Sequence, residues 1–413
     1  MIIHFLILEA LHYLLALYFA FRYKGASIIY LPVLFFYRYL YESQVPAMFW
    51  YLIIALFVAF VISQNLKFYR RSHLSLVFLA YMMVLVLINS SPLLNTSYFF
   101  NFSLLLLIIP LILHVTRKHD SIAIQSHLHR VSLWIMALFV INVGISSATG
   151  YVGPEGADMY GFTAGLVYGG MFAVHFNILP LAIFYASVRN FNKPNLFEYA
   201  LMAVSTLLLL FSLRRSVMVI MLLLLALLII LFQFEKKRIK TYVVLVLPTV
   251  LVLIMMIYYD VGGMFYERYA HRGLGEQVTV TIEDETRFAE YPVIYRDLFV
   301  YRAYNPLIGF EVFNSPGNYG RGMFGERTLH SDPTTIVHSS GLIGLMLYLV
   351  IFLTIFYRSF NRALDSRDRL IILAFAGIFI IYAITGRITE TAYISFFIMI
   401  LSLPYNKKHI FNE

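Results

Sequence analysis

Long apolar blocks recur along most of the chain, and they constrain its fold more than any other feature. Each block can cross a hydrocarbon core of about 30 Å as an α-helix rising 1.5 Å per residue. Uninterrupted runs such as LLLLALLII at 222–230 lack the alternation of β-barrel strands. We therefore predict an all-α polytopic membrane protein with about 12–13 transmembrane helices. The candidate spans are 2–21, 26–41, 46–64, 74–91, 98–115, 130–149, 161–188, 196–212, 216–234, 241–259, 338–357, 370–386 and 390–404.

Composition agrees with this class and excludes others. Of the 413 residues, 61% are hydrophobic and 13% are charged, whereas soluble domains carry roughly 25% charged residues. A water-soluble globule is therefore excluded. The chain has no cysteine, which excludes disulfides, thiolate metal sites and cysteine nucleophiles. No cationic residue precedes the first apolar run, so this run is predicted to be a retained span and not a cleaved signal peptide.

The positions of the basic residues predict the orientation. Of the 31 Lys and Arg residues, 20 fall in alternate connections, and the short connections between them hold almost none. The positive-inside rule places the basic connections and the C-terminus in the cytoplasm. The net charge of +9 is thereby assigned to cytoplasmic loops, and no nucleic-acid partner is predicted. The block at 26–41 is short and carries Arg38, so it is also compatible with a re-entrant segment; the N-terminus lies outside with thirteen spans and inside with twelve.

One connection is much longer than the others and falls on the outer side. It divides the chain into an N-terminal helix bundle (1–259), a large periplasmic loop (260–337) and a C-terminal region of helices with a cytoplasmic tail (338–413). Loops of this length are usually functional or disordered. VTVTI at 278–282 predicts a strand, and the spacing of apolar residues over 285–304 predicts a helix that Asn305-Pro306 ends.

Arginine and histidine on the outer side are the candidates for chemistry, because P-loop, GxGxxG, HExxH and GxSxG motifs are absent. Arg214 and Arg215 lie at a tight outer turn, against the topology rule, which favours either a bound phosphate or snorkelling to ordinary headgroups. His330 precedes the next span. Histidine has an ordinary pKa of about 6.5 and suits a general base, although a loop histidine is more often a surface residue. The acidic triplet 283–285 is interpreted as a solvated turn, and we predict no metal and no cofactor.

Three stretches, taken together, resemble the O-antigen polymerase and O-antigen ligase superfamily of bacterial envelope enzymes. FSLRRSVMVIMLLL is similar to its Ser-Arg turn before an apolar span, and ETRFAEYPVIYRDLFVYRAYNPLIGFEVF to its arginine-containing helix and Asn-Pro-Leu-x-Gly turn. His330 lies eleven residues before Gly341, which matches the spacing between the family's loop histidine and the glycine of the next span. The resemblance covers chiefly 205–400. Family ligases commonly have Asn where Ser331 follows the histidine, and often Trp at Tyr291, which favours the more divergent polymerases.

The resemblance implies an enzyme of the bacterial inner membrane whose active site faces the periplasm. Its substrate would be a polyprenyl-pyrophosphate-linked oligosaccharide, with the lipid held in the membrane. His330 would be the general base of an inverting, metal-independent glycosyl transfer. A flippase and a chain-length regulator are partners that the resemblance alone implies. The arginines expected to bind the pyrophosphate are Arg214, Arg215, Arg287, Arg296 and Arg387.

Two other functions remain open from the sequence. An O-antigen ligase would use the same donor with lipid A core as acceptor. A lipid-linked oligosaccharide flippase or transporter would carry out no chemistry. Transporters tend to show repeated halves and charges at mid-membrane. The spans here carry almost no charge and no internal repeat is visible, which favours the polymerase.

Overall fold

The structure is a computed structural model, and over the residues it describes it is helical, with one isolated bridge between Asn305 and Gly309. It describes residues 2–41, 43–88, 96–149, 176–190, 195–211, 215–234, 286–322, 325, 327–385 and 390–403. The predicted strand at 278–282 lies outside these ranges. The longer helices are α1 (Ile2–Tyr23), α3 (Ala47–Ser63), α4 (His73–Ile88), α5 (Thr96–Lys118), α6 (Ser121–Thr149), α8 (Ile178–Asn190), α9 (Leu196–Phe211), α10 (Arg215–Phe234), α13 (Thr286–Tyr295), α14 (Asp332–Arg362), α15 (Ser366–Thr385) and α16 (Thr391–Ser402).

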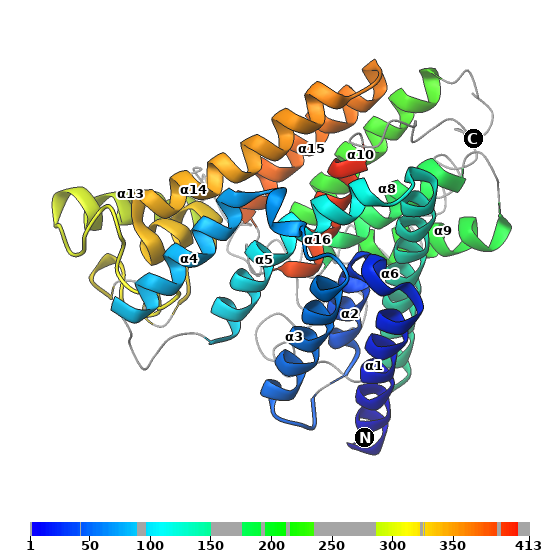
Figure 1. Cartoon of the computed structure of the whole chain (residues 1–413), viewed down its shortest axis with the longest axis horizontal. Helices are drawn as coiled ribbons and strands as arrows, with labels where there is room; N and C mark the ends of the chain where they lie inside the picture. Colours follow the sequence, from blue (N-terminus) through cyan, green and yellow to red (C-terminus); the bar gives the residue numbers. More distant parts are fainter. Residues whose placement is uncertain are drawn as a thin grey trace, which may run out of the picture.

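α16 lies at the centre of the bundle (Figure 1). All of its residues are buried, and it contacts α5, α8, α14 and the short helix α2 (Leu31–Tyr37). A helix that is apolar around its whole circumference is suited to such a site and not to the edge of a bundle. α14 runs along one side of the bundle, where it packs against α4 and α15. One large apolar core therefore joins the N-terminal and C-terminal helices.

Among the residues that the structure describes, four helical segments are long and apolar enough to cross a membrane: Phe5–Leu40, Ser97–Lys118, Ser121–Ala148 and Asp332–Arg362. Six shorter apolar helices accompany them within the same ranges. Large apolar side chains such as Leu14 and Leu353 are exposed by 60% and 64%. Apolar exposure on this scale is typical of lipid-facing helices. These features support the predicted class of α-helical membrane protein, while the count of 12–13 spans and their orientation remain predictions.

The segment Phe5–Leu40 folds back on itself. Lys24 has a left-handed backbone, with φ of 49°, and the returning chain brings Tyr37 against His12 with ring centroids 4.7 Å apart. The predicted block at 26–41 is thus a series of short helices: η1 (Lys24–Tyr30), α2 and η2 (Arg38–Leu40). Because a 3-10 helix rises about 2.0 Å per residue, such a series can reach about 30 Å with fewer residues than a regular helix.

The predicted helix over 285–304 is shorter than expected. α13 continues only as one π turn, η6 (Arg296–Val300), so the prediction that Asn305-Pro306 ends this helix is wrong. Arg302 adopts a left-handed φ of 49°, and Ala303 N donates to the carbonyl of Asp297, which turns the chain away from the helix axis. The helix therefore ends through this local turn, before the proline is reached.

α14 is broken at Gly341 and starts earlier than the predicted span at 338. Gly341 has φ of 67° and ψ of −167°, a region that only glycine adopts readily. The turn at Asn305–Gly309 fits into the break: Phe310 N donates to His338 O, and Leu342 N donates to Pro306 O, both at 2.8 Å. Hydrogen bonds lost at the break of the helix are thus replaced by backbone groups of the preceding turn.

A Gly341→Ala substitution should destabilise the protein strongly. A Cβ at this position would lie 2.2 Å from Leu307 O, and the backbone strain alone costs about 1–3 kcal/mol. Gly377→Ala in α15 is the matched control, because a Cβ there meets nothing within 4 Å and alanine favours a helix by about 0.5–1 kcal/mol. Thermal unfolding of the purified protein in detergent should show a lower midpoint for the first variant only. Equal midpoints for the two variants would contradict this account of the break.

Candidate functional site

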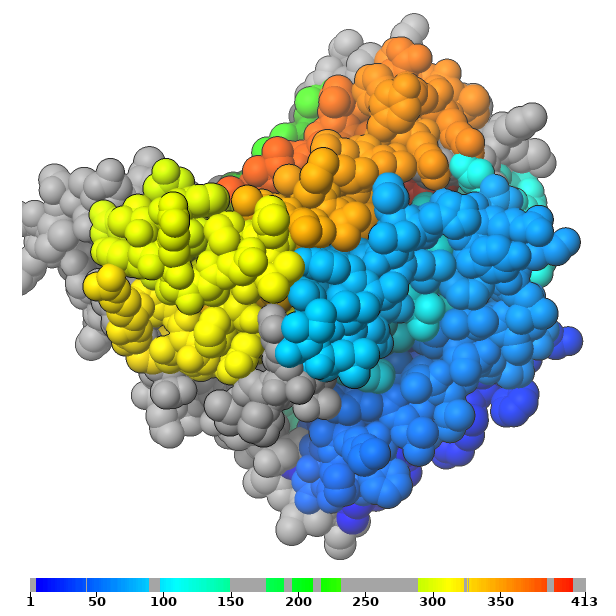
Figure 2. Space-filling view, turned by 60° about the vertical axis from the view of Figure 1, so that its left-hand side comes forward, coloured from blue at the N-terminus to red at the C-terminus, as the bar shows by residue number. Residues whose placement is uncertain are grey.

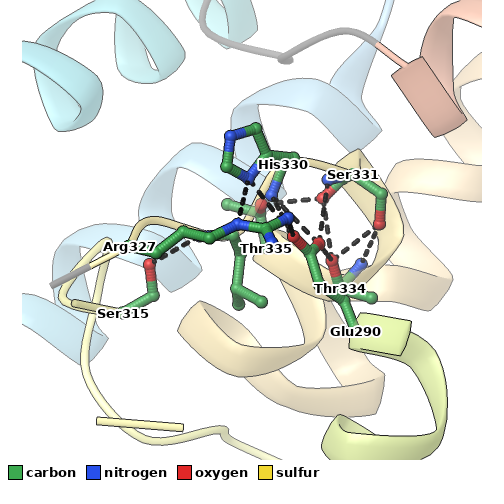
Figure 3. Close-up of polar contacts among 8 residues, drawn as sticks. Glu290, Ser315, Arg327, His330, Ser331, Thr334 and Thr335 are labelled. Atoms are coloured by element: carbon green, nitrogen blue, oxygen red, sulfur yellow. Dashed lines mark hydrogen bonds and ion pairs between the residues drawn. The ribbon is translucent and has the colours of Figure 1, made fainter. Parts of the chain in front are cut away.

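A buried carboxylate joins α13 to the start of α14. The side chain of Glu290 is 0% exposed and accepts a hydrogen bond from Arg327 Nη2 at 2.8 Å. The backbone N–H of His330 donates to the same carboxylate at 3.0 Å, and Thr334 Oγ1 donates to it at 3.2 Å. Figure 3 shows these groups converging on Glu290 from the loop and from α14. A buried acid with this many donors is held as an anion.

The pKa of Glu290 reflects two opposed effects. Burial raises the pKa of a carboxyl group, but the hydrogen bonds from the ring and backbone of His330, and the charges of His330 and Arg327, outweigh burial and lower it. Glu290 is therefore a carboxylate at neutral pH. A fixed negative charge is thus present at the base of the cluster.

The ring of His330 is held at one nitrogen and open at the other. Nδ1 lies 3.2 Å from Glu290 Oε1 and 3.2 Å from Arg327 Nε. Nδ1 can donate to the carboxylate or accept from the guanidinium, depending on the tautomer. Nε2 makes no hydrogen bond to any part of the chain that the structure describes, and the side chain is 28% exposed. With a proton on Nδ1, Nε2 is a free base oriented by a buried carboxylate, the relation found between histidine and acid in catalytic triads.

The start of α14 fixes the position of His330. Ser331 is the N-cap residue, with extended φ and ψ, and its side chain accepts a hydrogen bond from Thr334 N. Pro333 stands in the first turn, where proline is favoured because its missing N–H is not needed. Ser331, Asp332 and Thr334 are buried. The histidine therefore immediately precedes a rigid, well-capped helix end and not a free loop.

The structure does not show the predicted arginines in contact with this cluster, because the side chains of most of them are not described. Arg214 and Arg387 lie outside them. Arg215 begins α10 and Arg287 lies in the first turn of α13, but the structure does not describe the positions of their side chains. Arg296 is exposed on η6. The predicted convergence of these five arginines with His330 therefore remains a prediction.

Sequence reasoning missed Glu290 and Arg327, which are the two partners of His330. Glu290 could have been found, because it lies at i, i+4 and i+8 with Ile294 and Leu298, so an acid occupies the buried stripe of the helix. Arg327 is three residues before His330 but carries no comparable signal. The tyrosines of this region fall into two groups: Tyr304 and Tyr319 are buried, whereas Tyr295 and Tyr301 are exposed.

His338, at the start of the predicted span, is a histidine of the protein core. It is completely buried, with its ring between Tyr304 and Phe310 at centroid distances of 5.3 and 5.5 Å. Its Nε2 lies 3.2 Å from the carbonyl of Asn318 and donates to it. The residue thereby ties the loop to the first half of α14.

Comparison with known proteins adds no assignment. No protein-family model matches the chain, and no curated protein matches it at a significant level. Among the described residues, no group of three or more His, Asp or Glu side chains is arranged to hold a metal ion.

Replacing Glu290 should change both the stability of the protein and its dependence on pH. Glu290→Ala leaves Arg327 and two backbone N–H groups without their acceptor, which typically costs about 3 kcal/mol. Because the folded-state pKa is lowered, the carboxylate contributes stability above its ordinary pKa of 4.5, and this contribution is lost as the pH falls through the folded value. Thermal midpoints of wild type and Glu290→Gln should therefore differ most at neutral pH and converge on acidification. A constant difference down to pH 3 would contradict the lowered pKa.

Proposed function

We propose that this protein is an inverting, metal-independent glycosyltransferase that polymerises polyprenyl-pyrophosphate-linked oligosaccharide repeat units. The reaction would take place at the periplasmic face of the bacterial inner membrane, in O-antigen or capsule synthesis. The observation that carries the proposal is the pair of Glu290 and His330, with Nε2 of the imidazole free. The resemblance in sequence supplies the substrate class, and the apolar helices suit a substrate that is anchored in a bilayer.

His330 would act on the acceptor sugar. With Nδ1–H donating to Glu290, Nε2 takes the proton of the acceptor hydroxyl as its oxygen attacks the anomeric carbon of the donor. The new glycosidic bond forms on the opposite face from the bond to the diphosphate, which breaks, so the anomeric configuration inverts. The imidazolium is stabilised by the buried carboxylate, as expected for a general base.

The arginines would act on the leaving group. As the glycosidic bond breaks, negative charge grows on the lipid diphosphate, and preorganised cations that meet developing charge make a large catalytic contribution. Arg214, Arg215, Arg287, Arg296 and Arg387 are proposed for this role. The donor is already activated by its diphosphate, so this scheme needs no divalent cation.

Arg327 is a positioning residue that the family resemblance did not point to. Its Nη2 and Nε reach Glu290 and His330 Nδ1 respectively, so it competes with the carboxylate for the ring nitrogen. In the tautomer that the proposed reaction requires, Nδ1 carries a proton, so it donates to Glu290 and cannot accept from Arg327. The guanidinium then stays anchored to Glu290 through Nη2.

Substitution of His330 and of Glu290 should separate base from positioning residue. His330→Ala should lower the rate at which purified lipid-linked repeats are elongated by about 10²-fold or more. Glu290→Gln should lower kcat with little change in KM, and should alter the pH profile because the amide no longer favours the Nδ1–H tautomer. Elongation at the wild-type rate by His330→Ala would overturn the assignment of the base.

Deletion of the gene distinguishes polymerase from ligase: single repeats on the lipid A core indicate a polymerase, and free lipid-linked polymer indicates a ligase.

Removal of the outer arginines should weaken handling of the donor. Arg214→Ala and Arg215→Ala are expected to lower turnover at least 10-fold and to weaken binding of the lipid diphosphate, measured with purified protein and synthetic donor. Arg22→Gln is the control, because Arg22 is an exposed cation at the other end of a span, in the last turn of α1. Unchanged turnover and lipid affinity in the two alanine variants would remove the pyrophosphate role.

A further inference from the structure

We propose that the outward face of η6 and the turn after it form an interfacial surface that seats in the phospholipid headgroup region of the membrane. This interfacial surface consists of Tyr295, Arg296, Phe299, Val300, Arg302 and Leu307. The lipid bilayer is the binding partner that we propose for this surface. The inference shares only Arg296 with the residues proposed for the chemistry and does not rest on that chemistry.

The two faces of η6 differ sharply. Asp297 and Leu298 are 2% and 3% exposed: Asp297 accepts a hydrogen bond from Gly320 N in the loop, and Leu298 belongs to a small apolar cluster that includes Val337 of α14. On the other face, Tyr295 is 60% exposed, Phe299 45% and Val300 61%. A water-soluble loop would be expected to carry polar side chains at such positions. A short amphipathic helix with aromatic and aliphatic residues on its free face is typical of a segment that lies in a membrane interface.

Hydrogen bonds place the turn beside the lipid-facing part of α14. Ile343 N donates to Leu307 O, and Leu307 is itself 56% exposed. Beyond the break at Gly341, Ile343 and Met346 are exposed by 39% and 68%, whereas before the break the helix is buried. The turn therefore lies where the apolar outer surface of α14 begins.

Exposed apolar side chains also occur on α4, beyond the level of this turn. Tyr81 Oη donates to Ser340 O at 2.9 Å, which places Tyr81 level with the break in α14. Leu87 and Ile88 follow toward the end of α4 and are 81% and 68% exposed. At 1.5 Å per residue they lie about 10 Å past Tyr81 along the helix. Figures 1 and 2 show α13 and the loop at the same end of the molecule as this end of α4.

Basic side chains accompany the apolar ones. Arg296 and Arg302 are exposed on the same segment, and Arg321 lies 3.7 Å above the ring of Tyr301. The acid of η6, Asp297, is buried and accepts from Gly320 N. Arginine pairs bidentately with phosphate, and tyrosine is enriched at the membrane interface, so the charge and the aromatic character both match phospholipid headgroups.

The natural absence of cysteine allows a direct test on the full-length protein in phospholipid nanodiscs. Val300→Cys, labelled with a nitroxide, is compared with Met346→Cys as the lipid-facing control and with Ser366→Cys, exposed at the start of α15, as the water-facing control. Accessibility to oxygen relative to a water-soluble nickel chelate is measured by electron paramagnetic resonance. All three positions are exposed, so folding should be retained, which gel filtration checks.

We expect the oxygen-to-nickel ratio at position 300 to be several-fold higher than at 366 and to approach that at 346. A ratio equal to that at 366 would place the surface in water and overturn the proposal. Protection from both reagents would also overturn it, since that result means that protein covers the surface. Loss of catalysis in the His330 variant has no bearing on this ratio, so failure of one proposal is distinguishable from failure of the other.

Discussion

The burial of one carboxylate, Glu290, organises the region that carries the candidate site. An isolated anion removed from water is very unfavourable, and it is tolerated only where donors replace the lost hydration. Here the donors come from Arg327, from the backbone after residue 329 and from Thr334 in α14. These groups come from three parts of the chain, so satisfying the carboxylate requires that α13, the loop and α14 be in their native arrangement together. The cluster thus specifies geometry as well as charge.

The same arrangement leaves one reactive group available. Every oxygen of Glu290 is engaged, and Arg327 and Nδ1 of His330 are engaged with it, while Nε2 points away from these partners. Nε2 has no hydrogen-bond partner among the described residues, and the side chain is 28% exposed, so Nε2 is an atom that an incoming group can reach. This is the physical reason to regard His330 as a base held in a defined orientation, and it does not depend on the family resemblance.

The sequence predicted the class of fold well and the site only in part. Long apolar runs reveal helices directly, because a membrane-spanning segment must satisfy its own backbone hydrogen bonds. His330 was predicted from its position before a span and from its spacing to Gly341, and the structure places its ring beside Glu290 and Arg327, while its role stays a prediction. The left-handed backbone of Gly341, against which Leu307 packs, shows why a glycine is needed at that position. Arg327 was not predictable, because its role arises from a contact with a residue 37 positions away. The early end of the helix at Val300 was missed for a different reason, since a local turn at Arg302 acts before Asn305-Pro306 and no residue type there signals it.

The break in α14 reconciles two environments that one straight helix could not serve. Its first half carries buried polar residues, including Asp332, Thr334, His338 and Ser339, which need protein partners. Its second half presents side chains such as Met346 and Leu353 that are stable against lipid. Backbone groups freed at a break are costly inside a membrane unless other protein groups satisfy them, and the turn at 305–309 does so. The loop is therefore anchored to α14 at the point where the helix changes from a buried to an exposed environment.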